Sequence, residues 1–158
     1  MKVGITGHQE RKGIRWIWVE DTLRAELAKL GSVDKALSSL AAGSDQVFAH
    51  AAISLGIPLV AVVPLEGYER FFRGVVLAKY RKLLDQCEVI ELTWKGDPER
   101  AFFEAGKFIV DNCDRLFAVW DGEGAEGLGG TGDVVGYAQH RHRPVVHINP
   151  FAETVRLI

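Results

Sequence analysis

Short apolar runs alternate with longer segments of helical periodicity along the whole chain. The runs are of strand length and show little polar alternation; they cover residues 2–6, 33–40, 58–63, 88–92, 115–120 and 144–148. Between them, helical spacing and helix-start residues predict helices over 16–30, 45–55, 98–112 and 130–140, and a mostly helical segment over 66–84. Residues 36–42, which overlap the second run, are also compatible with a helix.

Strands that alternate with helices and lack polar residues at every second position are typical of a parallel sheet covered on both faces. The pattern therefore predicts a three-layer α/β fold, with a mostly parallel sheet of about six strands and helices on both faces. In the first helix, Ile17, Leu23, Leu27 and Leu30 recur at near-helical spacing and are expected to face the core. No linker or internal repeat divides the chain, so we expect a single domain over residues 1–158.

Composition and charge narrow the function classes. Hydrophobic residues make up 47% of the 158 positions and charged residues 25%, which is typical of a globular domain and argues against disorder, collagen or a coiled coil. Lys and Arg number 19 and Asp and Glu number 21, so the formal net charge is −2. Bulk charge therefore gives no reason to expect a nucleic-acid partner.

The cysteine count and the apolar runs bear on the compartment. Two cysteines, Cys87 and Cys113, are too few for a disulfide framework or a four-thiolate zinc site, and both adjoin apolar segments. We expect buried thiols in a reducing, cytoplasmic environment. The longest apolar run, 57–65, contains two prolines and is too short to span a bilayer, and no signal sequence opens the chain. We therefore expect no membrane partner.

The glycine-rich segment 121–136 is the strongest candidate for a binding loop. It holds seven of the seventeen glycines and leads into the predicted helix over 130–140. In a parallel sheet, ligands bind beyond the carboxyl ends of the strands, and glycine amides at a helix start suit a phosphate. The alternative is a flexible loop that ends in a helix cap. The candidate ligand-binding residues here are Gly129, Gly130, Thr131, Gly132 and Asp133, with Gly130 expected to tolerate a side chain least.

Further candidate ligand-binding residues follow the other predicted strands. They are Thr6, Gly7, His8, Gly43, Ser44, Asp45, Pro64 and Trp120. Gly7 would let a ligand approach the backbone closely. Asp45 and Asp133 each have two interpretations, as a ligand of ribose hydroxyls or as an acid that suits the helix dipole. Trp120 is either a surface for a stacked base or a core residue.

Several common site types are disfavoured. The pattern G-x-G-x-x-G occurs at 122–127 and 127–132, but it lies near the end of the chain and follows a long loop, which disfavours binding of NAD in the usual way. No G-K-S, G-K-T or G-x-S-x-G sequence is present, which argues against a P-loop and an α/β-hydrolase. His140 and His142 are two residues apart on a helix and point in different directions, so we expect no metal site and no cofactor.

Three of these loops together resemble the SLOG superfamily. The residues that carry the resemblance are Gly4-Ile5-Thr6-Gly7-His8, Gly43-Ser44-Asp45 and Gly129-Gly130-Thr131-Gly132-Asp133. This superfamily groups LONELY GUY phosphoribohydrolases, DNA-processing Smf proteins and YpsA-type proteins, and the opening segment is most similar to the YpsA-type or nucleotide-sensor branches. The resemblance implies a Rossmann-like fold that binds a nucleotide or nucleotide derivative, with phosphate at the glycine loop.

One departure from the superfamily's pattern favours ligand binding over catalysis. The phosphoribohydrolases carry G-G-x-G-T-x-x-E, and aligning Gly130-Thr131 on its G-T pair places Val134 where the glutamate belongs. No arginine occurs between residues 120 and 128. We therefore expect ligand binding without catalysis, in a small homo-oligomer. The alternatives are a nucleoside 5′-monophosphate phosphoribohydrolase, with Asp133 and Asp45 as candidate catalytic carboxylates, and a structural or partner-binding protein with a vestigial pocket.

Overall fold

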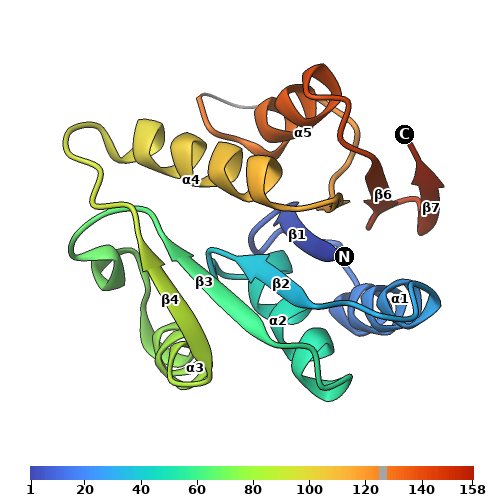
Figure 1. Ribbon diagram of the computed structural model, residues 1–158, viewed down its shortest axis with the longest axis horizontal. Coiled ribbons are helices and arrows are strands. Elements are labelled where there is room, and N and C mark those ends of the chain that lie inside the picture. Colours follow the sequence, from blue (N-terminus) through green and yellow to red (C-terminus); the bar gives the residue numbers. More distant parts are fainter. Residues whose placement is uncertain (125–127) are drawn as a thin grey trace.

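The fold is a twisted sheet between two layers of helices (Figure 1). The computed structural model describes residues 1–124 and 128–158. Within these residues the sheet has seven strands in the order β4-β3-β2-β1-β5-β6-β7, of which only β7 is antiparallel to its neighbour. The strands are β1 (Lys2–Gly7), β2 (Lys35–Ser38), β3 (Leu59–Val63), β4 (Cys87–Glu91), β5 (Arg115–Val119), β6 (Val145–Asn149) and β7 (Thr154–Leu157).

Helices cover both faces of the sheet, as the sequence pattern predicts. On one face lie α1 (Trp16–Lys29), α2 (Ser44–Ser54), the 3₁₀ helix η1 (Tyr68–Phe71) and α3 (Gly74–Leu84). On the other face lie α4 (Pro98–Asn112) and α5 (Thr131–His140). The three-layer, mostly parallel, Rossmann-like arrangement is therefore confirmed.

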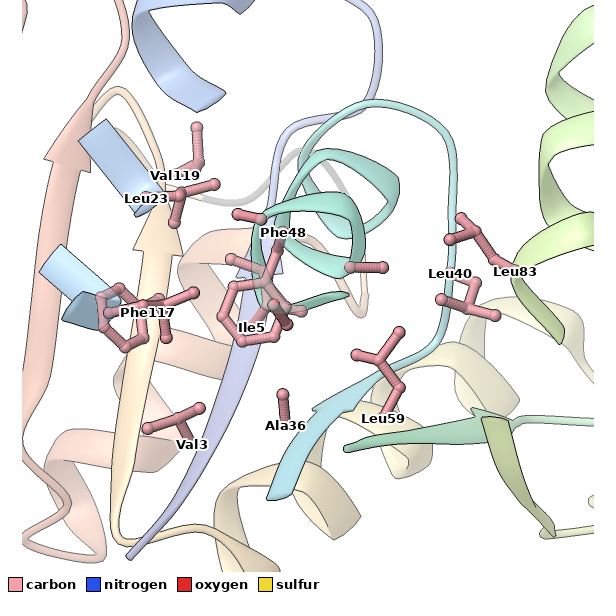
Figure 2. Packing of buried hydrophobic residues seen from close by; sticks show 14 of the residues in the cluster. Val3, Ile5, Leu23, Ala36, Leu40, Phe48, Leu59, Leu83, Phe117 and Val119 are labelled. Atoms are coloured by element: carbon pink, nitrogen blue, oxygen red, sulfur yellow. The ribbon is translucent and has the colours of Figure 1, made fainter. Parts of the chain in front are cut away.

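The central strands are apolar throughout because each of their two faces is buried. Phe117 and Val119 of β5 pack with Ile5 and Phe48 in the core between the sheet and α1–α3 (Figure 2). The intervening residues of β5, such as Ala118, pack on the opposite face against α4 and α5. Alternate residues thus serve different cores, and the strand shows no polar alternation.

The segment 66–84, predicted to be mostly helical, contains two helices with a break between them. Between η1 and α3, Phe72 (φ −115°, ψ 148°) and Arg73 (φ −139°, ψ 150°) are extended, and α3 begins at Gly74, which has φ +53°. The break lets Tyr68 and Phe72 turn inward, where the Phe72 ring stacks on Tyr80 with centroids 4.3 Å apart. Aromatic packing with residues from other elements therefore overrides the local helical pattern.

Two further expectations need correction at the edges of the fold. Ile17, expected to face the core, is 78% exposed on α1, and Val19 is buried in line with Leu23 and Leu27 instead. The sequence also gave no indication of β7. This strand pairs with β6 in antiparallel register, from Thr154 opposite Asn149 to Leu157 opposite Val146. All four side chains of β7 are exposed, so this strand lacks a hydrophobic pattern by which to recognise it.

Neither cysteine thiol is in an activated environment. Cys113 is buried and Cys87 is half-buried, and burial raises the pKa of Cys113 to about 12 and that of Cys87 to about 11. Both thiols are therefore protonated and unreactive at neutral pH. Over the described ranges, no helix combines the length and apolar character needed to cross a bilayer.

Candidate functional site

A cleft of about 500 Å³ opens beyond the carboxyl ends of the central strands. The strand order places β1 between β2 and β5, so the chain reverses its direction of travel across the sheet at this point. Such a switch point leaves a crevice between the loops on its two sides. Its lining comes from the end of β1 and the loop after it, from the loops after β2 and β3, from the loop between β5 and α5 with the first turn of α5, and from α4. The residues are 5–11, Ser39, Ala41, Ala42, Asp45, Pro64, Tyr68, Phe71, Phe72, Phe102, Gly106, Ile109, Trp120, Gly124, 129–132 and Val134.

The start of α5 lies at this cleft. Gly130 is the N-cap residue, and its carbonyl oxygen accepts from the amides of Asp133 and Val134 at 3.1 and 3.3 Å. The amides of Thr131 and Gly132 make no hydrogen bond to any described residue, and both residues line the cleft. Two unpaired donors at the positive end of a helix dipole favour a bound anion.

The backbone conformation requires glycine at position 129 but not at position 130. Gly129 has φ +86°, and a Cβ atom there would lie 2.8 Å from the carbonyl oxygen of Glu99 on α4. Gly130 has φ −65° and ψ 167°, a conformation open to any residue. Backbone strain therefore singles out Gly129, whereas a side chain on Gly130 would act mainly on the space of the cleft.

The Asp133 carboxylate forms a hydrogen bond with the glycine loop. Its Oδ2 accepts a hydrogen bond from the amide of Gly129 at 3.1 Å, across the first turn of α5. Asp133 is not among the residues that line the cleft, although Val134, at the place of the missing glutamate, is. Here the carboxylate stabilises the loop that positions the free amides.

Gly43 and Ser44, at the start of α2, contact the loop that follows β1. The hydroxyl and the amide of Ser44 both donate to the carbonyl oxygen of His8, at 2.6 and 3.2 Å. Gly43 has φ +77°, and a Cβ atom there would lie 2.9 Å from Gln9 backbone atoms. Neither Gly43 nor Ser44 lines the cleft. Their contacts lie within the protein.

Gly7 is also explained by packing within the protein. A Cβ atom on Gly7 would lie 2.5 Å from Cβ and Oγ of Ser44. Gly7 lines the cleft beside Thr6, but the group that approaches its backbone closely is the Ser44 side chain, not a ligand.

His8, Arg11 and Asp121 form a polar network at one end of the cleft. The amide of Asp121 donates to Nε2 of His8 at 3.0 Å, and Nη1 of Arg11 donates to Oδ2 of Asp121 at 2.9 Å. Burial opposes ionisation of Asp121, but the hydrogen bond from the Glu123 amide and the neighbouring His8 and Arg11 side chains hold its pKa below the usual range. Arg11 is 40% exposed and brings a cationic side chain to the cleft that we did not predict, although it lies only four positions after β1.

Asp45 is a buried carboxylate among the residues that line the cleft. It is 7% exposed, and Oδ2 accepts from the amide of Ala41 at 3.4 Å. Burial raises the pKa of Asp45 to about 7, although hydrogen bonds from Ala41, Ser39 and Ser38 oppose the shift. None of the ion pairs in the described part of the chain involves Asp45. This carboxyl group is therefore poised to change its ionisation state near neutral pH.

Aromatic side chains from η1 and α4 make the wall beyond β3. The residues of this aromatic wall are Tyr68, Phe71, Phe72 and Phe102. The Phe71 and Phe102 rings meet edge to face with centroids 5.1 Å apart, and Phe71 remains 44% exposed. From the sequence, only Pro64 in this region was a candidate ligand-binding residue, because the aromatic residues lie within a segment predicted to be mostly helical.

Trp120 and His147 lie at the carboxyl end of β5 and on β6. Nε1 of Trp120 donates to the carbonyl oxygen of Glu123 at 2.8 Å, and Nε2 of His147 is 2.8 Å from the carbonyl oxygen of Trp120. Trp120 lines the cleft while packing partly in the core. Among the described residues, no group of three or more His, Cys, Asp or Glu side chains is arranged to hold a metal ion.

Comparison with known proteins gives the fold but no closer relationship. The sequence matches no protein-family model and no curated protein. Its structure is similar to DNA processing protein A (DprA) from Streptococcus pneumoniae, with a TM-score of 0.66 and 18% identity over 94% of this chain and 50% of DprA. The chain thus spans half of the length of DprA.

Two further solved structures share the same architecture. The structural-genomics target TM1055 has a TM-score of 0.58 and 17% identity, over 91% of this chain and 71% of TM1055. The Moco carrier protein from Chlamydomonas reinhardtii has a TM-score of 0.54 and 17% identity, over 92% of this chain and 74% of that protein. At these identities the likeness shows a common Rossmann-like fold.

Proposed function

We propose that the cleft binds a phosphorylated nucleoside, with its phosphate at the start of α5. The observation that carries the proposal is the pair of amides on Thr131 and Gly132, two residues that line the cleft, which have no hydrogen-bond partner among the described residues. They lie at the switch point of the sheet, where ligands of such folds bind. A nucleotide phosphate would accept from both amides and would meet the positive end of the helix dipole.

The rest of the cleft suits the remainder of such a ligand. A volume of about 500 Å³ lies within the range of small-molecule sites and leaves room for a sugar and a base. The aromatic wall offers the exposed ring of Phe71 for contact with a base. Arg11 adds a cationic side chain that favours a negatively charged ligand.

Membership of the SLOG superfamily forms part of this proposal. The solved structures that share the fold include a DNA processing protein and a Moco carrier protein, as their names state. The loop residues that resemble the superfamily lie at the carboxyl edge of β1, at the start of α2 and at the start of α5. A nucleotide sensor that binds without catalysis accounts for Val134 at the position of the superfamily's glutamate.

Calorimetric titration tests the proposal. AMP, GMP, ADP-ribose and cyclic nucleotides would be titrated at millimolar concentration, with adenosine and inorganic phosphate as controls for the base and the anion alone. We expect saturable heat with at least one nucleotide and a higher melting temperature in its presence. If no nucleotide gives either signal, the proposal is wrong and the interpretation as a structural protein with a vestigial pocket takes its place.

The second candidate function is hydrolysis of the N-glycosidic bond of a nucleoside 5′-monophosphate, and Asp45 is the observation that favours it. The bond between C1′ and the base nitrogen breaks through an oxocarbenium-like transition state, and water supplies the oxygen that bonds to C1′. A carboxylate with a pKa of about 7 in the cleft could take the proton of that water at neutral pH. Asp133 is engaged with Gly129 and is placed less well for this role.

Chromatography separates the two functions. The protein would be incubated with AMP, GMP and CMP for hours, and free base would be measured against a buffer blank. Release of base that disappears in Asp45→Asn, with nucleotide binding retained, supports hydrolysis. Measurable binding without release of base supports a sensor.

A further inference from the structure

A second cavity, of about 320 Å³, lies beside β4, the outermost strand on one side of the sheet (Figure 1). It is lined by residues of α3, of β4 and of the loop that joins β3 to η1, and we call it the edge pocket. Among the described residues, Tyr68 is the only one that lines both the edge pocket and the cleft. The edge pocket is therefore a separate place for a ligand.

The edge pocket exists because α3 leaves part of the β4 surface uncovered. Val89 and Glu91 of β4 are paired with Ala61 and Val63 of β3. Ala61 belongs to the core between the sheet and α1–α3, and paired residues of neighbouring strands point to the same face, so Val89 and Glu91 face this side too. Ala61 is 1% exposed, whereas Val89 is 43% exposed. The apolar surface of Val89 is thus open to a ligand.

Tyr80 brings a buried hydroxyl group without a partner to the edge pocket. The residue is 2% exposed, and its ring stacks on Phe72. In the described part of the chain, only the hydroxyls of Tyr68 and Tyr137 form hydrogen bonds among the tyrosines. Arg115 Nε is the one fully enclosed side-chain atom there without a partner, so the Tyr80 hydroxyl reaches open space in the pocket that the residue lines. A ligand that bonds this hydroxyl would offset the cost of its burial.

Three carboxylates give the edge pocket a negative potential. They belong to Glu66, Glu69 and Glu91, and no Lys, Arg or His is among the described residues that line the pocket. Two nitrogens of Arg81 donate to Glu69, at 3.0 and 3.1 Å, and Arg70 donates to the backbone carbonyl oxygen of Glu66 at 3.0 Å. Within the described ranges, Glu66 and Glu91 take part in no ion pair. Two carboxylates therefore remain available to a cation.

We propose that the edge pocket binds a primary alkylammonium group carried on a short apolar chain. An ammonium group has three N–H donors, which suit the Tyr80 hydroxyl together with Glu66 and Glu91. Burial, with the charges of Glu69 and Glu91, raises the pKa of Tyr80 to about 12, so the hydroxyl is neutral and accepts from such a donor. The chain would pack on Val89, and the volume lies at the lower end of small-molecule sites.

Titration with three probes that share one chain tests the ammonium group. They are n-pentylamine, 1-pentanol and n-pentyltrimethylammonium, each followed near neutral pH through the methyl NMR signals of Leu84 and Val89, which line the pocket. We expect saturable shifts with n-pentylamine and binding about tenfold weaker or less with the other two. 1-Pentanol lacks the charge, and the trimethylammonium group donates no hydrogen bond. Equal affinity of the three probes, or no saturation with n-pentylamine, would overturn the proposal.

Two variants locate the bound ammonium group. Tyr80→Phe keeps the ring on Phe72 and removes a hydroxyl without a partner, so the affinity for n-pentylamine should fall about tenfold with no loss of melting temperature. Glu91→Gln should weaken n-pentylamine and leave 1-pentanol unchanged. Glu88→Gln is the matched control, because Glu88 lies on the opposite face of β4, where it pairs with Lys35 at 2.6 Å. Wild-type affinity in both Tyr80→Phe and Glu91→Gln would reject the site.

Two further probes distinguish the sources of the ammonium group. Cadaverine represents a free diamine, and Nα-acetyl-lysine amide represents the lysine side chain of a peptide. Binding of either probe that Glu91→Gln weakens supports the proposal, and the tighter binder identifies the source. Binding that Glu91→Gln leaves unchanged would overturn it. None of these outcomes depends on whether the cleft binds a nucleotide.

Discussion

The Ser44 hydroxyl donates a hydrogen bond of 2.6 Å to the carbonyl oxygen of His8, although the two residues are 36 positions apart. This contact joins the loop after β1 to the start of α2, and both residues are buried. It explains why Gly7 and Gly43 carry no side chain, since a Cβ atom on either would collide with this junction. The junction fixes one side of the cleft before any ligand binds.

We expect Ser44→Ala to lower the free energy of unfolding by about 1–2 kcal/mol, the cost of one buried hydrogen bond whose acceptor keeps a second donor. Denaturant titration measures this change. Ser54→Ala is the control on the same helix, because Ser54 is exposed. Its Oγ donates to the carbonyl oxygen of Ala51 at 2.7 Å and accepts from Nε of the surface residue Arg24 at 3.2 Å. If both variants lost the same free energy of unfolding, the hydrogen bond between Ser44 and His8 would contribute no more to stability than the one made by Ser54.

Gly129→Ala should destabilise the protein more than Gly124→Ala. The φ of +86° at Gly129 and the 2.8 Å approach of a Cβ atom to the Glu99 carbonyl oxygen both oppose a side chain, at a cost of about 1–3 kcal/mol. A Cβ atom on Gly124 would meet no atom within 4 Å. Thermal or denaturant unfolding of both variants tests the difference. A neutral Gly129→Ala would show that the loop moves freely relative to α4.

Gly130→Val should weaken nucleotide binding at least tenfold and change the free energy of unfolding by only about 1 kcal/mol. Its φ of −65° accepts a side chain, but the added isopropyl group adjoins the amides proposed to hold the phosphate. Gly136→Ala on the same helix is the control, since no atom lies within 4 Å of a Cβ atom there. Calorimetry gives the affinities, and unchanged affinity in Gly130→Val would reduce the glycine loop to a connector.

Asp45→Asn should raise the stability of the ligand-free protein at pH 8. The folded pKa of about 7 lies above the unfolded value, so the folded state binds more protons and wild-type stability falls as the pH rises from about 4 to 7. The full effect is on the order of 4 kcal/mol. The Asn variant should lack this decline, whereas Asp21→Asn, which removes an exposed carboxylate on α1, should keep it. Parallel stability profiles for wild type and Asp45→Asn would show that Asp45 ionises normally.

Local pattern determined the elements that carry the fold. The apolar runs were long enough to mark six strands, and Pro98 correctly marked the start of α4, with Asp97 capping it through the amide of Glu99 at 3.1 Å. The glycine-rich sequence before Thr131 predicted the start of α5. These features depend on neighbours in the chain, so periodicity and helix-start chemistry suffice to find them.

Tertiary structure decided which candidate groups face the cleft. From sequence, Ser44, Asp45 and Asp133 were equivalent polar residues at helix starts. All three make hydrogen bonds within the protein, Ser44 to His8, Asp133 to Gly129 and Asp45 to Ala41, but only Asp45 also lines the cleft. The aromatic wall likewise required η1 and α4 to meet across 31 residues, from Phe71 to Phe102. A residue's type sets which hydrogen bonds and contacts it can make, but elements that are distant in sequence determine which of them are already made within the protein and which are left for a ligand.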